Sequence, residues 1–276
     1  MRETELDPST SPVAAFGVQL RRSRKAAGLN QVQLGELTNL SDSQVSNLER
    51  GTRTPTLDWV RATDRVLATG GTLELMYWSL SGSSLLEGFP EYVAHEAKAI
   101  ELRMFELGLI PGLFQTKAYA QALAAAAVRR GTITEEDAEE RVSYLLVRQQ
   151  RLSQPTAPLV HAVLDESCIL RQVGGAAVMR EQLDHLAQLA DRPRTIVQIA
   201  PFSMGERRPF VAMVYLLTMA DRSYRGYTES QERGFLARES ELVTRWAREY
   251  DRLQVGASSE VASLERIRAA RKEVRS

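Results

Sequence analysis

Two capped helix starts, eleven residues apart, constrain the fold of this chain more than any other feature. Asn30 is followed three residues later by Gln33, and the pair forms a capping box. Ser41 and Gln44 repeat the pattern. In a capping box the first side chain accepts a hydrogen bond from the third helical N–H, and the third side chain bonds back. Because the second start follows so soon, the pattern predicts two short helices joined by a tight turn. Asn39 falls in the predicted turn. It suits that position because asparagine tolerates the left-handed conformation.

The second of these helices is predicted to run over residues 42–50 and to stop at Gly51. Its only large apolar residues, Val45 and Leu48, share one face. The opposite face carries short polar side chains: Ser43, Ser46, Asn47 and Arg50. Side chains of this kind read base edges when a helix lies in the major groove of DNA. The alternative is a small helical bundle with a solvated polar face.

The loop that follows this helix offers groups that bind phosphate: Arg53, threonine hydroxyls and backbone N–H groups. The whole chain has a formal net charge of zero. Residues 13–69, however, hold eight basic and five acidic side chains, an excess of three positive charges. A basic N-terminal segment in an otherwise neutral-to-acidic chain is typical of a regulator that binds DNA through one end.

Composition divides the chain into four parts. Residues 1–12 are rich in serine, threonine and proline, and are predicted to form a flexible tail. Residues 13–69 are predicted to be a mainly α helix-turn-helix domain. Residues 70–85 contain paired glycines and a Ser-Gly-Ser-Ser run, which predict a linker. Residues 86–276 are predicted to be an α+β domain for sensing, partner binding or dimerisation, because helices come first and strands mixed with helices follow.

Periodicity gives the expected elements of this C-terminal part. Helices are predicted over residues 91–107, 117–128, 135–152, 176–190, 231–253 and 259–274. Strands are predicted over residues 159–164, 195–200, 210–218 and 224–228.

Signals for catalysis, cofactors and metals are missing from the sequence. The histidines lack metal-ligand spacing, and no Cys-x-x-Cys or glycine-rich phosphate loop is present. We therefore expect no catalytic residue, no metal and no cofactor. Asp165 and Glu166 are neighbours at a strand end, and are expected to cap a helix beginning near Ser167 rather than to act as an acid/base pair. The single cysteine, Cys168, excludes an internal disulfide framework and is expected to be a small buried residue, with a redox sensor as the alternative. With no signal peptide and no apolar run of ~18 residues, we expect a cytoplasmic protein without membrane contact.

Residues 16–67 resemble the Xre/Cro/phage-repressor helix-turn-helix domain. The likeness rests on Gly28-Leu29-Asn30-Gln31, Leu34-Gly35-Glu36-Leu37, the stretch from Leu40 to Gly51, and Arg53-Thr54-Pro55. Two positions depart from the usual pattern: Gly35 stands where such proteins often have alanine, and Asn39 where they often have glycine. Both residues are expected to fit sterically.

The resemblance implies DNA contacts at matching positions: a phosphate contact for Gln31, base-edge contacts for Asp42, Ser43 and Asn47, and backbone contacts for Arg50 and Arg53. Ser46 lies on the same predicted face and completes the candidate DNA-binding set. Asp42 can accept from a cytosine amino group, but repels phosphate otherwise. Glu49 is expected to pair within the domain.

The C-terminal part resembles that of a large group of actinobacterial regulators with the same N-terminal domain. The matching residues are Glu96-Ala97, Ile110 to Thr116, Tyr119-Ala120, Arg148-Gln149, Leu152, Leu164-Asp165-Glu166, Val173-Gly174, Gln182-Leu183 and Pro201-Phe202. The resemblance implies an antitoxin-like protein, often encoded beside a very small partner protein.

These observations predict a sequence-specific regulator that binds double-stranded DNA as a homodimer, with the dimer contact in the C-terminal domain or in residues 73–80. Two alternatives remain open. One is a protein-interaction scaffold that sequesters a small partner. The other is an enzyme tethered to DNA, whose pocket would gather Asp165, Glu166 and Glu229.

Overall fold

The computed structural model describes residues 7–8, 10–80, 85–231 and 233–274. The chain divides into two compact units, Met1–Ser83 and Ser84–Ser276. Most of the predicted tail and residues 81–84 of the predicted linker lie outside the described residues. No helix in the described ranges is long and apolar enough to cross a membrane.

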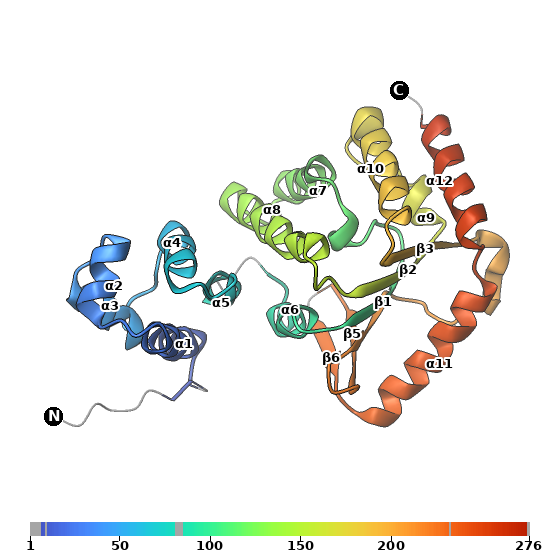
Figure 1. The fold of residues 1–276 in the computed structure, drawn as a ribbon. Coiled ribbons are helices and arrows are strands. Elements are labelled where there is room, and N and C mark those ends of the chain that lie inside the picture. The colour runs from blue at the N-terminus through green and yellow to red at the C-terminus, as the bar shows by residue number, and fades with distance from the viewer. Residues whose placement is uncertain (1–6, 9, 81–84, 232, 275–276) are drawn as a thin grey trace. The chain divides into compact units, whose positions relative to one another are not determined.

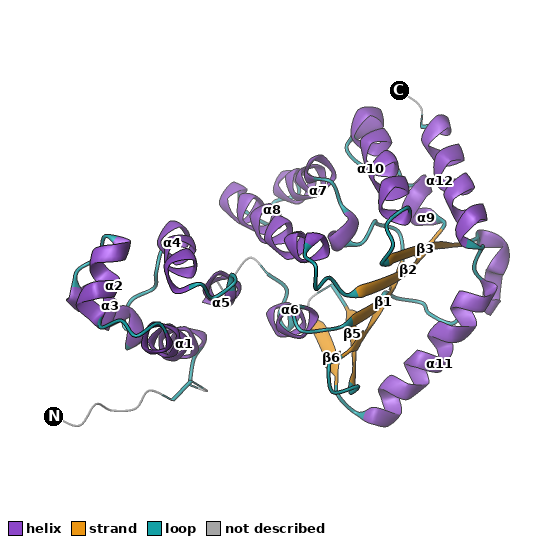
Figure 2. Ribbon diagram, in the orientation of Figure 1, coloured by secondary structure: helices purple, strands orange, loops and turns teal. Residues whose placement is uncertain are grey.

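The first unit is helical (Figure 2). Its helices are α1 (Pro12–Ala26), α2 (Gln31–Thr38), α3 (Asp42–Glu49), α4 (Leu57–Leu67) and α5 (Thr72–Leu80). Their apolar faces meet in one core, where Phe16, Leu20, Leu34 and Val45 are fully buried. The core therefore fixes α3 by its apolar face and leaves its other side at the surface of the unit.

Helix α5 occupies much of the segment that composition predicted to be a linker. It packs against α1 and α4, and Leu73 is fully buried in the same core. Asp64 of α4 caps its start, accepting hydrogen bonds from the backbone N–H groups of Leu73 at 3.0 Å and Glu74 at 2.8 Å. The paired glycines before α5 turn the chain but do not end the unit, so residues 72–80 belong to the helical domain.

The second unit combines a sheet with helices on both faces (Figure 1). Its helices are α6 (Phe89–Glu96), α7 (Lys117–Arg129), α8 (Glu135–Gln149), α9 (Ser167–Leu170), α10 (Gly175–Ala190), α11 (Ser240–Gly256) and α12 (Glu260–Glu273), with short 3₁₀ turns η1 (Gly112–Phe114), η2 (Gln150–Ser153) and η3 (Phe202–Arg207). Its strands are β1 (Glu101–Glu106), β2 (Leu159–Asp165), β3 (Thr195–Ala200), β4 (Val214–Thr218), β5 (Tyr224–Glu229) and β6 (Gly234–Ala237).

The strands form one mixed sheet in the order β3-β2-β1-β4-β5-β6. Strands β1, β2 and β3 are parallel, whereas β4, β5 and β6 continue the sheet by antiparallel pairing. Helix α11 covers one face, and α7, α8 and α10 lie on the other (Figure 1). The α+β fold class predicted from the sequence is confirmed.

Strand β3 would be an open edge without α12. The Ser263 hydroxyl of α12 accepts from the backbone N–H of Ile199 at 2.9 Å, and the N–H of Ser258 donates to the Ile199 carbonyl at 2.9 Å. These bonds use the groups that an edge strand otherwise offers to another chain. The edge of β3 is therefore closed at Ile199 within the unit.

Two predicted helices were wrong in part. The helix expected over residues 91–107 ends at Glu96, and residues 101–106 form β1 near the centre of the sheet. Its apolar residues have helical spacing, but Leu102, Met104 and Phe105 are buried in a strand that pairs with β2 on one side and β4 on the other. The helix expected over residues 231–253 begins only at Ser240, because residues 234–237 pair with β5 as strand β6. In both places tertiary pairing overrides local periodicity.

Candidate nucleic-acid interface

Both predicted capping boxes are present at the starts of α2 and α3. The Asn30 side chain accepts from the N–H of Gln33 at 2.8 Å, and the Gln33 side chain accepts from the N–H of Asn30 at 2.8 Å. Ser41 and Gln44 exchange the equivalent bonds at 3.2 and 2.9 Å. The two helix starts are thus set by local chemistry, as the sequence indicates.

The turn between α2 and α3 depends on two residues. Asn39 adopts the left-handed conformation with φ of 56°, as predicted. The N–H of Leu40 then donates to the Gly35 carbonyl at 2.9 Å. A Cβ on Gly35 would lie 2.4 Å from the Leu40 carbonyl oxygen, which no real Cβ contact allows. Glycine at position 35 is therefore required by this turn, and is more than a tolerated replacement for alanine.

A buried ion pair ties α3 to α1 and α2. Glu49 is fully buried, and its carboxylate accepts from Arg24 Nε at 2.5 Å and Arg24 Nη2 at 2.9 Å. The Gln31 amide donates to the same carboxylate at 2.8 Å, and Arg21 Nε lies 3.4 Å away. The expectation that Glu49 pairs within the domain is confirmed. Its partners were missed, although Arg21 and Arg24 stand three apart on one face of α1.

The candidate base-reading side chains lie on the side of α3 away from the core. Ser43 is exposed, and Ser46 and Asn47 are partly exposed. Val45 and Leu48, on the other side of the helix, are 0% and 2% exposed. The helix is therefore anchored by apolar residues and presents short polar ones at the surface of its unit. This is the surface that insertion into a groove needs.

Asn47 is held in place by two neighbouring side chains. Its amide oxygen accepts from Arg50 Nη2 at 2.6 Å, and the Thr52 hydroxyl donates to the Asn47 backbone carbonyl at 3.1 Å. A bidentate contact to adenine uses both the oxygen and the NH₂ of an asparagine side chain. The amide oxygen has a second lone pair and the NH₂ has two donors, so Asn47 can hold Arg50 and still offer both kinds of group at the surface.

The remaining candidates surround α3. One amide N–H of Gln31 donates to Glu49, and the second N–H can donate to a phosphate oxygen. Arg53 is exposed in the loop after Gly51. Asp42 is exposed in the first turn of α3 and accepts from the N–H of Ser43 at 2.7 Å. An acid there stabilises the helix start, which accounts for Asp42 without a DNA contact.

Two family models match the chain. One, described as a helix-turn-helix domain, covers residues 15–75. The other, described as a domain of unknown function, DUF5753, covers residues 89–269. The chain belongs to the DUF5753 family. Searches of curated proteins and of solved structures found no significant match. The first unit of this DUF5753 protein is a helix-turn-helix domain, which indicates a DNA-binding regulator.

Several conspicuous residues of the DUF5753 unit hold its elements together. Arg148 of α8 forms two hydrogen bonds with Glu96 of α6, at 3.0 and 2.7 Å, and both side chains are buried. Gln182 of α10 is fully buried and bridges the N–H of Thr116 and the carbonyl of Phe114. These positions are therefore explained by the fold.

The three acids that an enzyme would need to gather are kept apart. Asp165 accepts from the N–H of Ser167 at 3.0 Å and from Arg208 at 3.2 Å. Glu166 is the N-cap residue of α9 but makes no side-chain cap hydrogen bond, so the prediction that both acids cap this helix was wrong for Glu166. Glu166 instead accepts from Arg266 at 2.6 Å and from the N–H of Phe202 at 2.7 Å. Glu229 ends β5, three strands away from β2, so about 14 Å of sheet separates the backbones of the two strands.

The part of the chain that the structure describes contains no cluster of metal ligands and no reactive thiol. Within it, no three histidine, cysteine, aspartate or glutamate side chains gather to hold a metal. Cys168 is fully buried, and burial raises the pKa of its thiol well above the usual range. A thiol in that state is a poor nucleophile and redox sensor.

Proposed function

We propose that this DUF5753 protein is a cytoplasmic, sequence-specific transcription regulator that reads DNA with α3 as a homodimer. One observation carries the proposal. The polar face of Ser43, Ser46 and Asn47 lies at the surface of a helix that the apolar core and the Glu49 ion pair fasten to the rest of its unit. A short, polar helix face is what direct readout in the major groove uses.

Dimerisation follows from the small size of this face. One α3 contacts only a few base pairs, so useful specificity needs two copies on half-sites about one helical turn apart. The C-terminal unit is proposed to supply this contact and to bind a partner, without performing a reaction. An antitoxin-like role with a small partner protein, or a scaffold that sequesters that partner, rests on the sequence resemblance alone.

Selection from random duplex DNA, followed by footprinting upstream of the protein's own gene, tests the proposal. Asn47→Ala is expected to lose sequence preference while keeping weak, salt-sensitive binding, because phosphate contacts remain. Arg65→Ala, at an exposed position of α4, is the matched control and should bind like the unaltered protein. An Asn47→Ala protein with unchanged affinity and footprint would show that α3 is not the reading helix.

A further inference from the structure

We infer that the groove between α7 and α8 is the face through which two copies of this chain pair. The inference deepens the proposed function, since it locates the dimer contact that reading two half-sites requires. The shape, polarity and charge pattern of the groove support it.

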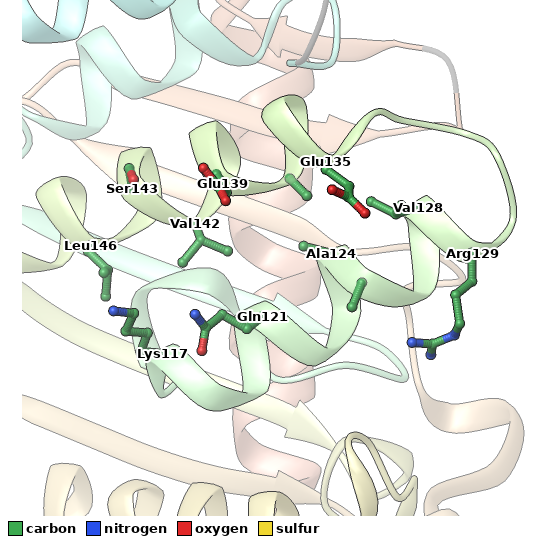
Figure 3. Close-up of a pocket in the computed structure, with 12 residues that line it drawn as sticks. Lys117, Gln121, Ala124, Val128, Arg129, Glu135, Glu139, Val142, Ser143 and Leu146 are labelled. Carbon is green, nitrogen blue, oxygen red and sulfur yellow. The ribbon is translucent and has the colours of Figure 1, made fainter.

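The groove runs along the seam of the α7–α8 hairpin and has a volume of about 620 Å³ (Figure 3). Helix α7 contributes Lys117, Gln121, Ala124, Ala125, Val128 and Arg129 to its lining. Helix α8 contributes Glu135, Ala138, Glu139, Val142, Ser143 and Leu146. Both sets follow spacings of three and four, so each forms one stripe along its helix.

The floor of the groove is apolar and incompletely covered. Ala124, Val128 and Leu146 are partly exposed, and Ala125 is exposed. Small side chains let another helix approach closely enough to pack its ridge between α7 and α8. A helical hairpin with such a stripe buries it by pairing with a second hairpin, as in a four-helix bundle.

The charges of the groove are divided between its two walls. Lys117 and Arg129 stand on the α7 wall, and Glu135 and Glu139 stand on the α8 wall; all four are exposed. In Figure 3, Lys117 lies at the end of the groove near Leu146, and Arg129 lies at the end that holds Glu135. One wall is thus basic and the other is acidic.

This division makes the face complementary to itself. A two-fold axis parallel to the helices places α7 of one copy opposite α8 of the other, so basic walls meet acidic walls twice. Arg129 then faces Glu135 of the second copy at the hairpin end, and the apolar stripes meet between them. Closed two-fold pairing of one surface with itself is the commonest form of homo-oligomer.

The size of the face sets the expected strength of pairing. Residues 117 to 129 of α7 span about 18 Å at 1.5 Å per residue. A contact between two such hairpins is at the small end of specific interfaces. We therefore expect a dimer that forms at micromolar concentrations in solution and that binding to paired half-sites strengthens.

Sedimentation equilibrium of the full chain without DNA, up to about 100 µM, tests the inference. Arg129→Glu and Glu135→Arg should each raise the dimer dissociation constant about tenfold, because each change removes two symmetric pairs and brings like charges together. The double variant, which exchanges the two charges, should recover most of the loss. Ala125→Arg should keep the protein monomeric.

The chain offers closely matched controls. Arg130→Glu and Glu136→Arg alter exposed neighbours that do not line the groove, and should leave the dimer unchanged. Circular dichroism of each variant verifies that it is folded. A chain that stays monomeric at about 100 µM overturns the inference. The groove would then be a binding site for a helix of another protein. A dimer that ignores Arg129→Glu, Glu135→Arg and Ala125→Arg overturns the inference as well.

The outcome is separable from that of the proposed function. If the dimer is absent but the Asn47-dependent footprint persists, the interface is wrong and the DNA-reading proposal stands. If the dimer depends on the groove but no DNA sequence is selected, the interface stands and the proposed function is wrong.

Discussion

Replacing Glu106 by glutamine should make the second unit more stable at neutral and alkaline pH. Glu106 ends β1, where burial raises the pKa of its carboxyl from 4.5 to about 7. The charge of Glu229 adds to the rise. Hydrogen bonds from the Tyr215 hydroxyl at 2.5 Å and the N–H of Leu107 at 3.1 Å oppose it. The ionised form is therefore disfavoured in the folded unit despite two donors.

The size and pH window of the effect follow from that shift. A carboxyl with a raised folded pKa keeps a proton that the unfolded chain has already released. Stability therefore falls as pH rises from near 4.5 to about 7, and stays low above it. Each pKa unit corresponds to about 1.4 kcal/mol, so the cost above pH ~7 is about 3 kcal/mol. This is an upper bound, because Glu106 is partly exposed and water screens part of the cost.

Cys168 provides the assay. It is the only cysteine of the sequence, is fully buried, and lies in the same unit, with its Sγ 3.5 Å from the Glu106 carbonyl oxygen. Its labelling in urea therefore reports unfolding of the second unit in the intact chain. Glu106→Gln should raise the unfolding free energy at about pH 8 by up to ~3 kcal/mol, and the gain should vanish near pH ~4. Glu265→Gln, an exposed position of α12, is the control. Equal stabilities at about pH 8, or a gain that persists at low pH, would refute the reasoning.

Three further predictions concern the first unit. Arg24→Met leaves the fully buried Glu49 without its two-bond partner and should destabilise the unit by about 3 kcal/mol, measured by urea unfolding with circular dichroism; an unchanged midpoint would contradict the role of this pair. Gly17→Ala places a Cβ 2.7 Å from the backbone carbonyl oxygen of Glu49, and the enforced shift of α1 should cost about 1–3 kcal/mol in the same assay. A neutral or stabilising result would mean that α1 and α3 move apart freely. Arg53→Ala should weaken binding to all DNA sequences alike and lower the slope of log affinity against log salt by about one, measured by titration at several salt concentrations; a loss confined to one sequence would instead make Arg53 a base-reading residue.

The helix-turn-helix could be predicted from the sequence because local interactions determine it. The capping boxes of Asn30 and Ser41 act within three residues, and the left-handed Asn39 acts within a single turn. The placement of Val45 and Leu48 opposite Ser43 and Asn47 follows from helical periodicity alone. These features need no knowledge of the rest of the chain, so they could be predicted before any coordinates.

Other parts of the fold depend on partners that are distant in the sequence. Residues 101–106 have helical spacing but become β1, because β2 and β4 flank them with hydrogen bonds and apolar side chains. Residues 72–80 sit among loop-forming residues but become α5, because Asp64 caps them and the core accepts Leu73. Such outcomes come from long-range packing, which local propensity does not contain.

The sequence by itself determined where the two short helices begin, which face of the second is polar, and that a mixed α+β unit follows. Only the tertiary structure decided which arginines hold Glu49, why a Cβ at positions 17 and 35 would meet neighbouring backbone, and how the charges of α7 and α8 divide across one groove. The physical reason is range. Caps and periodicity act within a turn or two of helix, whereas ion pairs, close backbone contacts and shared surfaces form only when distant segments meet.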